Sequence, residues 1–169
     1  RDFCLSRGLG DVYKRQQLYC VSPWVLVWEN GNYYLIAYTD GRLKHYRVDK
    51  MQNVRPLPDT TREGADEYAN FDVNTYMQQM FGMFNGPLKR VTLLCENRFA
   101  GAMIDRFGTG PVLVPCADGE HFTMTAEIQV SPQFFGWVAG FGTGVVVSGP
   151  PEVRAEMKKT LDQLQELYR

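Results

Sequence analysis

The first third of the chain is a series of short runs of β-branched and aromatic residues separated by turn residues. Four such runs cover residues 24–29, 33–38, 43–49 and 51–57. Asn30-Gly31 separates the first two runs, and an Asn-Gly pair in that position is a strong signal of a two-residue β-hairpin. Asp40-Gly41 repeats the signal before the third run. The pattern predicts four short antiparallel strands, a meander of a size that commonly curls into a small barrel.

The rest of the chain alternates between strand and helix patterns. Asp72 can cap a helix through about Phe84, in which Val73, Met77, Met80 and Phe84 form one apolar stripe. Further strands are predicted over residues 89–96, 112–116, 121–130 and 145–147, with helices over residues 97–107 and 132–138. Pro151 begins a long final helix whose apolar side carries Val153, Met157, Leu161, Leu164 and Tyr168. This order predicts a ferredoxin-like sandwich with an additional C-terminal helix.

The predicted fold class is therefore α+β, with a small antiparallel β-barrel followed by a ferredoxin-like α/β sandwich. We place the barrel at residues 17–58, a polar linker at 59–71 and the second domain at 72–169. Residues 1–16 (RDFCLSRGLGDVYKRQ) show neither strand alternation nor a helical stripe, and they have no apolar core of a signal peptide. Because they are similar to a translated library adapter, we expect them to be a non-native tail.

The charges of the 169 residues are unevenly distributed. The chain has 18 Lys and Arg against 19 Asp and Glu, a net charge of −1. Residues 1–57 hold nine basic and five acidic side chains, and residues 58–169 hold nine and fourteen. No apolar run approaches the roughly 18–20 residues needed to cross a bilayer, so we expect no integral membrane protein. The basic excess of the barrel makes it the first place to look for an anionic ligand.

The cysteines indicate a reducing compartment and carry no metal motif. Cys4, Cys20, Cys95 and Cys116 are widely spaced, without the CxxC pattern of zinc or redox sites. Cys95 and Cys116 lie in or next to apolar strand-like runs, where we expect reduced, buried thiols. Four cysteines are too few for a disulfide scaffold, so a cytoplasmic location is favoured.

The sequence offers little catalytic chemistry. His45 and His121 are its two histidines, and the common catalytic motifs are missing, so we expect no enzyme activity, cofactor or metal. The glycine-rich run at residues 140–144 lies between a helix and a strand, the reverse of the phosphate-binding order, and is interpreted as a connector. For His121 we expect a surface or structural role. An enzyme using Cys116, Asp118, Glu120 and His121, which lie close in sequence, is one remaining hypothesis.

The third predicted strand carries the candidate binding residues. Alternation places Tyr46 and Val48 on one face, suited to the barrel core, and His45 and Arg47 on the other, with Lys50 just beyond. Tyr33 and Tyr34 on the preceding strand point to opposite faces. Arg47 offers a planar fork of donors for phosphate or carboxylate, and basic groups beside aromatic rings are typical of nucleic-acid surfaces. The alternative is a solvated strand face with an Arg47–Asp49 ion pair.

The same residues resemble the WYL domain. The matching segments are residues 22–38 (SPWVLVWENGNYYLIAY) and 43–51 (LKHYRVDKM). Tyr33-Tyr34-Leu35 stands where that family has Trp-Tyr-Leu, with Tyr33 in place of the Trp. The stretch HYRVDKM at residues 45–51 is similar to the family's FRLDRI-like strand, with Lys50 where Arg is common. Residues 72–168 are similar to the C-terminal extension of these proteins, called WCX.

The resemblance implies a function. WYL domains are Sm-like (SH3-type) β-barrels, found mainly in bacterial transcription regulators behind a winged helix-turn-helix. It implies an effector that is nucleotide-like or single-stranded nucleic acid, and homodimers formed through the extension. The implied ligand-binding residues are Ser22, Tyr33, Tyr34, His45, Arg47 and Lys50.

The sequence departs from the family pattern at its beginning. It has no helix-turn-helix, and the usual first barrel strand with its preceding helix is missing. We therefore expect an N-terminally truncated regulator that would contact DNA only through a missing N-terminal domain. A stand-alone nucleic-acid-binding accessory module is the alternative. An upstream winged-helix segment in the gene would favour the first hypothesis, and a start codon near residue 17 would favour the second.

Overall fold

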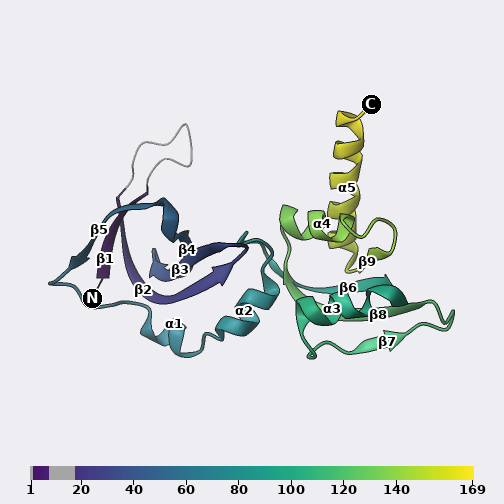
Figure 1. The fold of residues 1–169 in the computed structure, drawn as a ribbon, viewed down its shortest axis with the longest axis horizontal. Helices are drawn as coiled ribbons and strands as arrows, with labels where there is room; N and C mark the ends of the chain where they lie inside the picture. Colours follow the sequence, from purple (N-terminus) through teal and green to yellow (C-terminus); the bar gives the residue numbers. More distant parts are fainter. Residues whose placement is uncertain (1, 8–17) are drawn as a thin grey trace. The chain divides into compact units, whose positions relative to one another are not determined.

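The chain folds into two compact units, Arg1–Asp72 and Val73–Arg169. Their architecture is given by a computed structural model that describes residues 2–7 and 18–169 (Figure 1). Both units combine an antiparallel sheet with helices, so the predicted α+β class is confirmed. Within the described residues, no helix is long and apolar enough to span a membrane.

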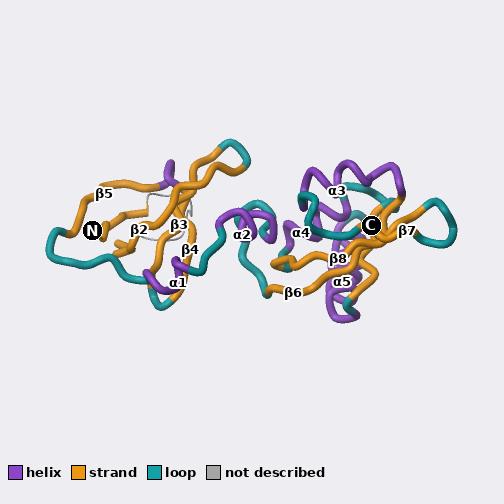
Figure 2. Tube along the Cα trace, turned by 90° about the horizontal axis from the view of Figure 1, so that it is seen from below, coloured by secondary structure: helices purple, strands orange, loops and turns teal. Residues whose placement is uncertain are grey.

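The first unit is built on a five-stranded sheet in the order β4-β3-β2-β1-β5, in which all neighbouring strands are antiparallel. Figure 2 draws its strands in orange, with β2, β3, β4 and β5 labelled. Its strands are β1 (Asp2–Arg7), β2 (Leu18–Glu29), β3 (Asn32–Thr39), β4 (Arg42–Arg47) and β5 (Met51–Leu57). The start of β2 pairs with β1, and the rest of β2 pairs with β3. A bulge between Pro23 and Val25 lies on the part of β2 that pairs with β3, and such a bulge bends a strand.

Both predicted hairpins are confirmed. Asn30 and Gly31 have φ of 47° and 77°, and Asp40 and Gly41 have φ of 50° and 75°. A type I′ turn needs a positive φ at both central positions, which Asn, Asp and Gly tolerate best. The two turns therefore fix the register of β2, β3 and β4, which directly determines which side chains share a face.

The fourth strand does not continue the meander. After β4 the chain runs through a 3₁₀ turn, η1 (Val48–Lys50), and β5 then pairs with β1. Among the described strands no ladder joins β4 to β5, so the sheet is not a closed barrel. Tyr46 is buried as predicted, but the prediction for Val48 is wrong, because it is 36% exposed. Strand alternation ends at Arg47, and Val48 belongs to the 3₁₀ turn.

Strand β1 lies within the segment expected to be a non-native tail. Its backbone pairs with β2 on one side and with β5 on the other. A strand therefore lies between β2 and β5. From the resemblance to the WYL domain, we expected the first barrel strand to be missing. The foreign origin of residues 1–16 stays a prediction, and residues 8–16 lie outside the described part of the chain.

Residues 59–71, predicted as a linker, contain helix α1 (Ala65–Ala69) and belong to the first unit. We call them the strap, because they are bound to the surface of the sheet. The backbone N–H of Glu63 donates to Ser22 Oγ (2.9 Å), and Trp24 Nε1 donates to the Glu63 carbonyl (3.0 Å). The Trp24 ring stacks on Tyr68 at 4.6 Å. Polar bonds and one aromatic stack thus hold the strap on the sheet.

Two further contacts fix the path of the strap. The guanidinium of Arg62 lies 3.7 Å from the centre of the Trp24 ring, a cation–π contact. Gly64 adopts a left-handed φ of 79° and packs so closely on Tyr38 that a Cβ atom there would overlap the ring. Glycine is required at this position for both reasons.

The second unit contains a four-stranded antiparallel sheet in the order β7-β8-β6-β9. Its strands are β6 (Leu88–Glu96), β7 (Leu113–Pro115), β8 (His121–Gln129) and β9 (Val145–Gly149). Its helices are α2 (Val73–Gln79), α3 (Ala100–Phe107), α4 (Pro132–Ala139) and α5 (Pro151–Leu167), and a 3₁₀ turn η2 (Asn97–Phe99) precedes α3. Every strand predicted here is present, with its bounds within a few residues of the prediction.

The core of the second unit lies on one face of this sheet. Val91, Leu93 and Cys95 alternate along β6 and are completely buried, as a strand with one covered face requires. They pack with side chains of α3 and α4, among them Phe107 and Phe134. Helix α4 begins as predicted, with Ser131 Oγ accepting from the Phe134 N–H (3.4 Å) and Pro132 in the first turn.

Helix α2 is shorter than predicted. It ends at Gln79, five residues before Phe84, because Gly82 and Met83 have positive φ values of 58° and 61° that a helix excludes. The stripe prediction is right for Met80, which is buried, and wrong for Phe84, which is 50% exposed.

Of the two cysteines expected to be buried thiols, Cys95 is completely buried and Cys116 only partly. Burial raises the pKa of the Cys95 thiol to about 11, so this thiol stays protonated at neutral pH. Cys116 follows the short edge strand β7, where less chain covers it.

Candidate ligand-binding site

Strands β3 and β4 position the candidate site. Their register pairs Tyr34 with Arg47 and Ile36 with His45. Directly opposed residues in an antiparallel ladder share a face, and so do residues two apart on one strand. Tyr34, His45 and Arg47 therefore lie on one face of the sheet. The rings of Tyr34 and His45 meet edge to face, with 6.3 Å between their centroids.

Arg47 is held in one orientation by two neighbours. Its Nε and Nη2 donate to the two carboxylate oxygens of Asp49, at 3.0 and 2.8 Å. The same Nη2 donates to Asn32 Oδ1 at 2.8 Å. Among the described residues, the Nη1 amino group has no hydrogen-bond partner. One edge of the guanidinium fork is thus fixed, and the Nη1 donors are open to a ligand.

Arg47 and Asp49 form the ion pair that is expected if this part of the sheet is simply a solvated strand face. The hydrogen bonds of Arg47 hold the pKa of Asp49 below its usual value, and those of Asp49 raise the pKa of Arg47. Both side chains are substantially exposed, at 37% and 51%. An exposed pair of this kind contributes little to stability. A phosphate could therefore compete for the arginine at small cost to the fold.

Tyr33 and Ser22 lie apart from this group. Lys50 lies near enough to Asp49 for its charge to help Arg47 lower the pKa of that carboxyl. Lys50 is half-buried in η1, three residues beyond Arg47. Tyr33 is 55% exposed on the opposite face, because it precedes Tyr34 on the same strand. Ser22 is only 3% exposed, and its hydroxyl accepts the Glu63 N–H of the strap. The structure thus gives Ser22 a packing contact, and its ligand role stays a prediction.

Trp28 and Asn32 were missed by the sequence reasoning. Trp28 is 59% exposed and meets Tyr33 edge to face, with 4.7 Å between the ring centroids. Asn32 holds the guanidinium of Arg47. The signal was present in the sequence, since a two-residue Asn30-Gly31 turn places Trp28 opposite Tyr33 and puts Asn32 first on β3.

A groove of about 530 Å³ on the first unit differs from the Arg47 face in chemistry. It is lined only by apolar side chains: Pro23, Trp24, Val25, Leu26, Leu35, Met51 and Val54. Such a lining offers no donors for an anion. Of these two surfaces, the face with Tyr34, His45 and Arg47 is the one that can recognise a negatively charged group.

In the second unit, the group considered for catalysis forms a turn. Asp118 Oδ1 accepts from the N–H groups of Glu120 and His121, and Asp118 Oδ2 lies 2.8 Å from His121 Nδ1. These bonds, with the Glu120 N–H first, lower the pKa of Asp118. Throughout the described part of the chain, no three His, Cys, Asp or Glu side chains are placed to hold a metal. The glycine-rich run at 140–144 lies between α4 and β9, as predicted for a connector.

Comparison with protein families identifies both units. The family model for the WYL domain matches residues 12–56, and the model for the WCX domain matches residues 87–165. Among curated proteins, none matches the chain.

Solved structures to which this chain is similar include the following two. A protein described as CRISPR Cas-related is 13% identical, with a TM-score of 0.52, over 99% of this chain and 47% of its own. Proteasome accessory factor B/C (PafBC) of Arthrobacter aurescens is 18% identical, with a TM-score of 0.40, over 92% of this chain and 24% of its own. The first likeness concerns the fold alone. The chain spans less than half the length of either protein.

Proposed function

We propose a function from one premise: the chain belongs to the family of proteins in which a WYL domain is followed by a WCX domain. The proposed function is the ligand-sensing, regulatory part of a bacterial transcriptional regulator. In this proposal the first unit binds the effector and the second unit supports a homodimer. Contact with DNA would come from a helix-turn-helix domain outside the present sequence, and no catalytic step is involved.

The strand orders support the finer fold assignment that goes with this function. The second unit has the order β9-β6-β8-β7, with α3 and α4 following β6 and β8. We assign it to the ferredoxin-like sandwiches, which combine this order with two crossover helices. The first unit has β1 between β2 and β5 and a 3₁₀ turn before β5. We interpret it as an Sm-like sheet that is open between β4 and β5.

The main support for this function is the guanidinium of Arg47, which is hydrogen-bonded within the protein through Nε and Nη2. Asp49 and Asn32 fix its Nε and Nη2 side, while Nη1 points to no protein group among the described residues. The N–H groups of Nη1 can donate to a phosphate oxygen, and a phosphate that displaced Asp49 would also gain the planar Nε/Nη2 edge. The Tyr34 and His45 rings beside it offer edges and faces to a base or sugar. Lys50, close in sequence, adds a second positive charge.

The effector class that fits is a nucleotide-like molecule or a single-stranded nucleic acid. Both bring phosphates and aromatic bases, and both would bind more weakly as salt is added. The exposed pair of Trp28 and Tyr33 lies on the other face of the hairpin, so only a ligand longer than a mononucleotide could reach it as well.

Fluorescence anisotropy with a labelled oligothymidylate, and competition by a cyclic dinucleotide, tests the proposal. Arg47→Ala should weaken binding about tenfold or more, since a hydrogen bond to a charged group contributes about 1.5–3 kcal/mol. Asp49→Asn should strengthen binding, because it removes the carboxylate that competes for the guanidinium.

Arg42→Ala is the matched control. Arg42 is an exposed arginine on the same strand, five positions from Arg47 and therefore on the other face. Its loss removes the same charge and should change affinity only by the general electrostatic contribution, about threefold or less. Equal effects of the two substitutions, or unchanged binding by a folded Arg47→Ala variant, would overturn the site.

A further inference from the structure

The final helix leaves most of its apolar side uncovered. Only Val153 near its beginning is fully buried, and Met157 packs partly against the core. Beyond that point Leu161 and Leu164 are 45% and 46% exposed, and Tyr168 is 89% exposed. Figure 1 shows α5 running away from β9 with its C-terminal end clear of the sheet of its own unit. The second half of the helix therefore has no packing partner within the second unit.

The uncovered side chains have the spacing of a helix–helix seam. Met157, Leu161 and Leu164 of α5, and Tyr168 just past its end, follow one another at intervals of four, three and four residues, which is the a/d spacing of a coiled coil. Single exposed leucines are common on protein surfaces. A stripe at this spacing is different, because it lets one side of a helix pack on another surface, as Val153 and Met157 of the same stripe pack on the core.

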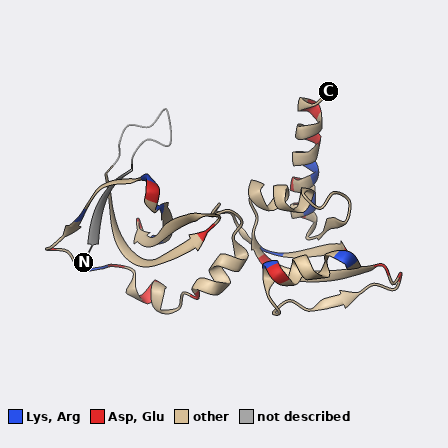
Figure 3. Cartoon of the chain, in the orientation of Figure 1, with Lys and Arg blue, Asp and Glu red and all other residues tan. Residues whose placement is uncertain are grey.

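The charges of α5 favour a second copy of the same helix in the opposite direction. Residues 151–160 carry Arg154, Lys158 and Lys159 against Glu152 and Glu156, a net charge of +1. Residues 161–169 carry Asp162 and Glu166 against Arg169, a net charge of −1. In the coloured ribbon of Figure 3, blue positions lie on the first part of the helix and red positions on the part nearest its C-terminal end. The helix dipole has the same sense, positive at the N-terminus.

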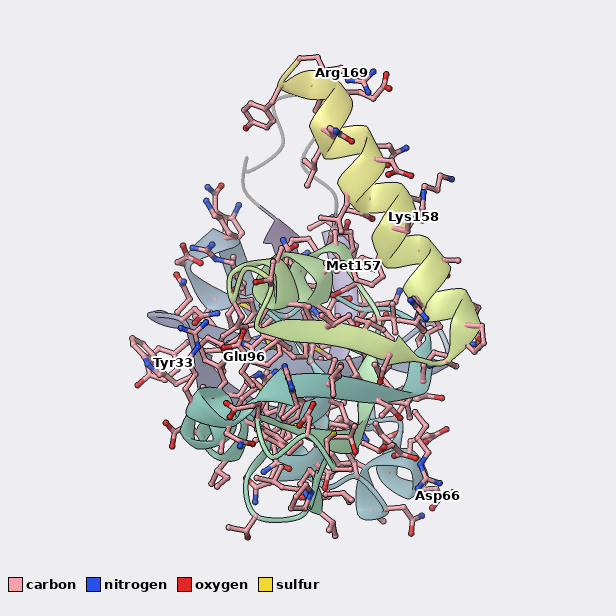
Figure 4. All side chains as sticks on the ribbon, turned by 90° about the vertical axis from the view of Figure 1, so that its right-hand side faces the viewer. Tyr33, Asp66, Glu96, Met157, Lys158 and Arg169 are labelled. Carbon is pink, nitrogen blue, oxygen red and sulfur yellow. The ribbon has the colours of Figure 1, made fainter. Side chains whose placement is uncertain are left out.

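We propose that α5 is a self-association surface that pairs antiparallel with α5 of a second copy of this chain. The pairing places Leu161 beside Leu164 of the partner subunit and Met157 beside the partner's Tyr168. It puts Lys158 and Lys159 beside the partner's Glu166, whereas parallel pairing would put the lysines of the two copies together. Figure 4 shows Met157 and Lys158 at the middle of the helix and Arg169 at its end, so the surface covers the last three turns. The proposal gives the proposed homodimer a defined surface and does not depend on the ligand site.

The small area of the proposed α5 surface limits the affinity of the pairing. Four side chains from each copy bury well under the roughly 1,200 Å² of a standard interface. The pairing is therefore weak by itself, with dissociation expected at tens to hundreds of micromolar. At lower concentration the chain is monomeric unless another contact adds to this one.

Sedimentation equilibrium of the full chain from low to several hundred micromolar tests the surface. The native sequence should show a monomer–dimer equilibrium, and Leu164→Asp should raise the dissociation constant at least tenfold. Gln163→Asp is the control, because it places the same charge one position away on the exposed, polar side of the helix. The control should change the constant less than threefold. Circular dichroism should show equal helix content in the two variants.

Three results would overturn the proposal. The native chain could remain monomeric at several hundred micromolar, or Leu164→Asp and Gln163→Asp could behave alike. The third result concerns the relative direction of the two paired helices, which disulfide cross-links mapped by mass spectrometry would show. A mixture of Met157→Cys and Tyr168→Cys chains should cross-link residue 157 to residue 168. Efficient cross-linking of Met157→Cys to itself would contradict the antiparallel arrangement. Because none of these readouts involves a ligand, failure here is distinguishable from failure of the Arg47 site.

Discussion

The first unit gathers three buried side chains into its cluster over the described residues 18–72, whereas the second gathers sixteen. The second unit covers one face of its sheet with helices, and its interior holds phenylalanine, methionine and valine side chains. The first unit depends on strand pairing and on a strap of exposed residues bound to its surface. The candidate ligand groups lie in the unit whose described residues form the smaller core.

The difference separates stability from recognition. A large core buries apolar surface and contributes most of the free energy of folding. A small, open sheet leaves aromatic and basic side chains accessible, and a ligand or the strap can change its stability appreciably. We therefore expect the two units to unfold separately, the first before the second.

Leu93→Ala is expected to have the largest effect. Leu93 is completely buried at the centre of the second unit's core, and such a truncation costs about 3 kcal/mol. Differential scanning calorimetry of the full chain should show two transitions, with only the later one moved to lower temperature. Leu26→Ala, at a leucine 60% exposed on the first unit, is the control and should cost under about 0.5 kcal/mol. A single transition that moves as a whole would show that the chain unfolds as one cooperative unit.

Gly64→Ala should have the next largest effect, on the first unit alone. The substitution adds a left-handed alanine and a Cβ that overlaps the Tyr38 ring. Gly31→Ala has the same positive φ with no atom near its Cβ, so it isolates the backbone cost of about 1–2 kcal/mol. Gly64→Ala should cost more than Gly31→Ala in the earlier transition. It should also accelerate proteolytic cleavage within residues 59–71.

Equal costs for the two glycine substitutions would contradict the strap. They would mean that Gly64 only makes a turn and that its contact with Tyr38 contributes nothing. Faster cleavage in Gly31→Ala than in Gly64→Ala would be equally inconsistent with a bound strap.

Local signals explain what the sequence predicted correctly. Both hairpins depend on a dipeptide that tolerates positive φ, and the cap of α4 depends on Ser131 followed by Pro132. Arg47 and His45 were placed on one face by alternation alone, which is a property of any regular strand. Each of these features is determined by residues a few positions apart.

The errors and omissions come from contacts distant in sequence or from backbone exceptions. Helix α2 ends early because Gly82 and Met83 take positive φ, which an apolar stripe does not reveal. The strap is held by bonds such as Glu63 N–H to Ser22, 41 positions apart. The same bond explains why Ser22, proposed as a ligand residue from the family resemblance, lies buried. Pairing of β5 with β1 is likewise a long-range event.

The most direct test of the proposed division of roles is an amide NMR titration of the full chain with unlabelled oligothymidylate. Signals of residues around Tyr34, His45 and Arg47 should shift in a salt-sensitive manner, while those of the second unit's core stay in place. Arg47→Ala should remove most of these shifts. Shifts confined to the second unit, or shifts in the first unit that are unchanged in Arg47→Ala, would contradict the account.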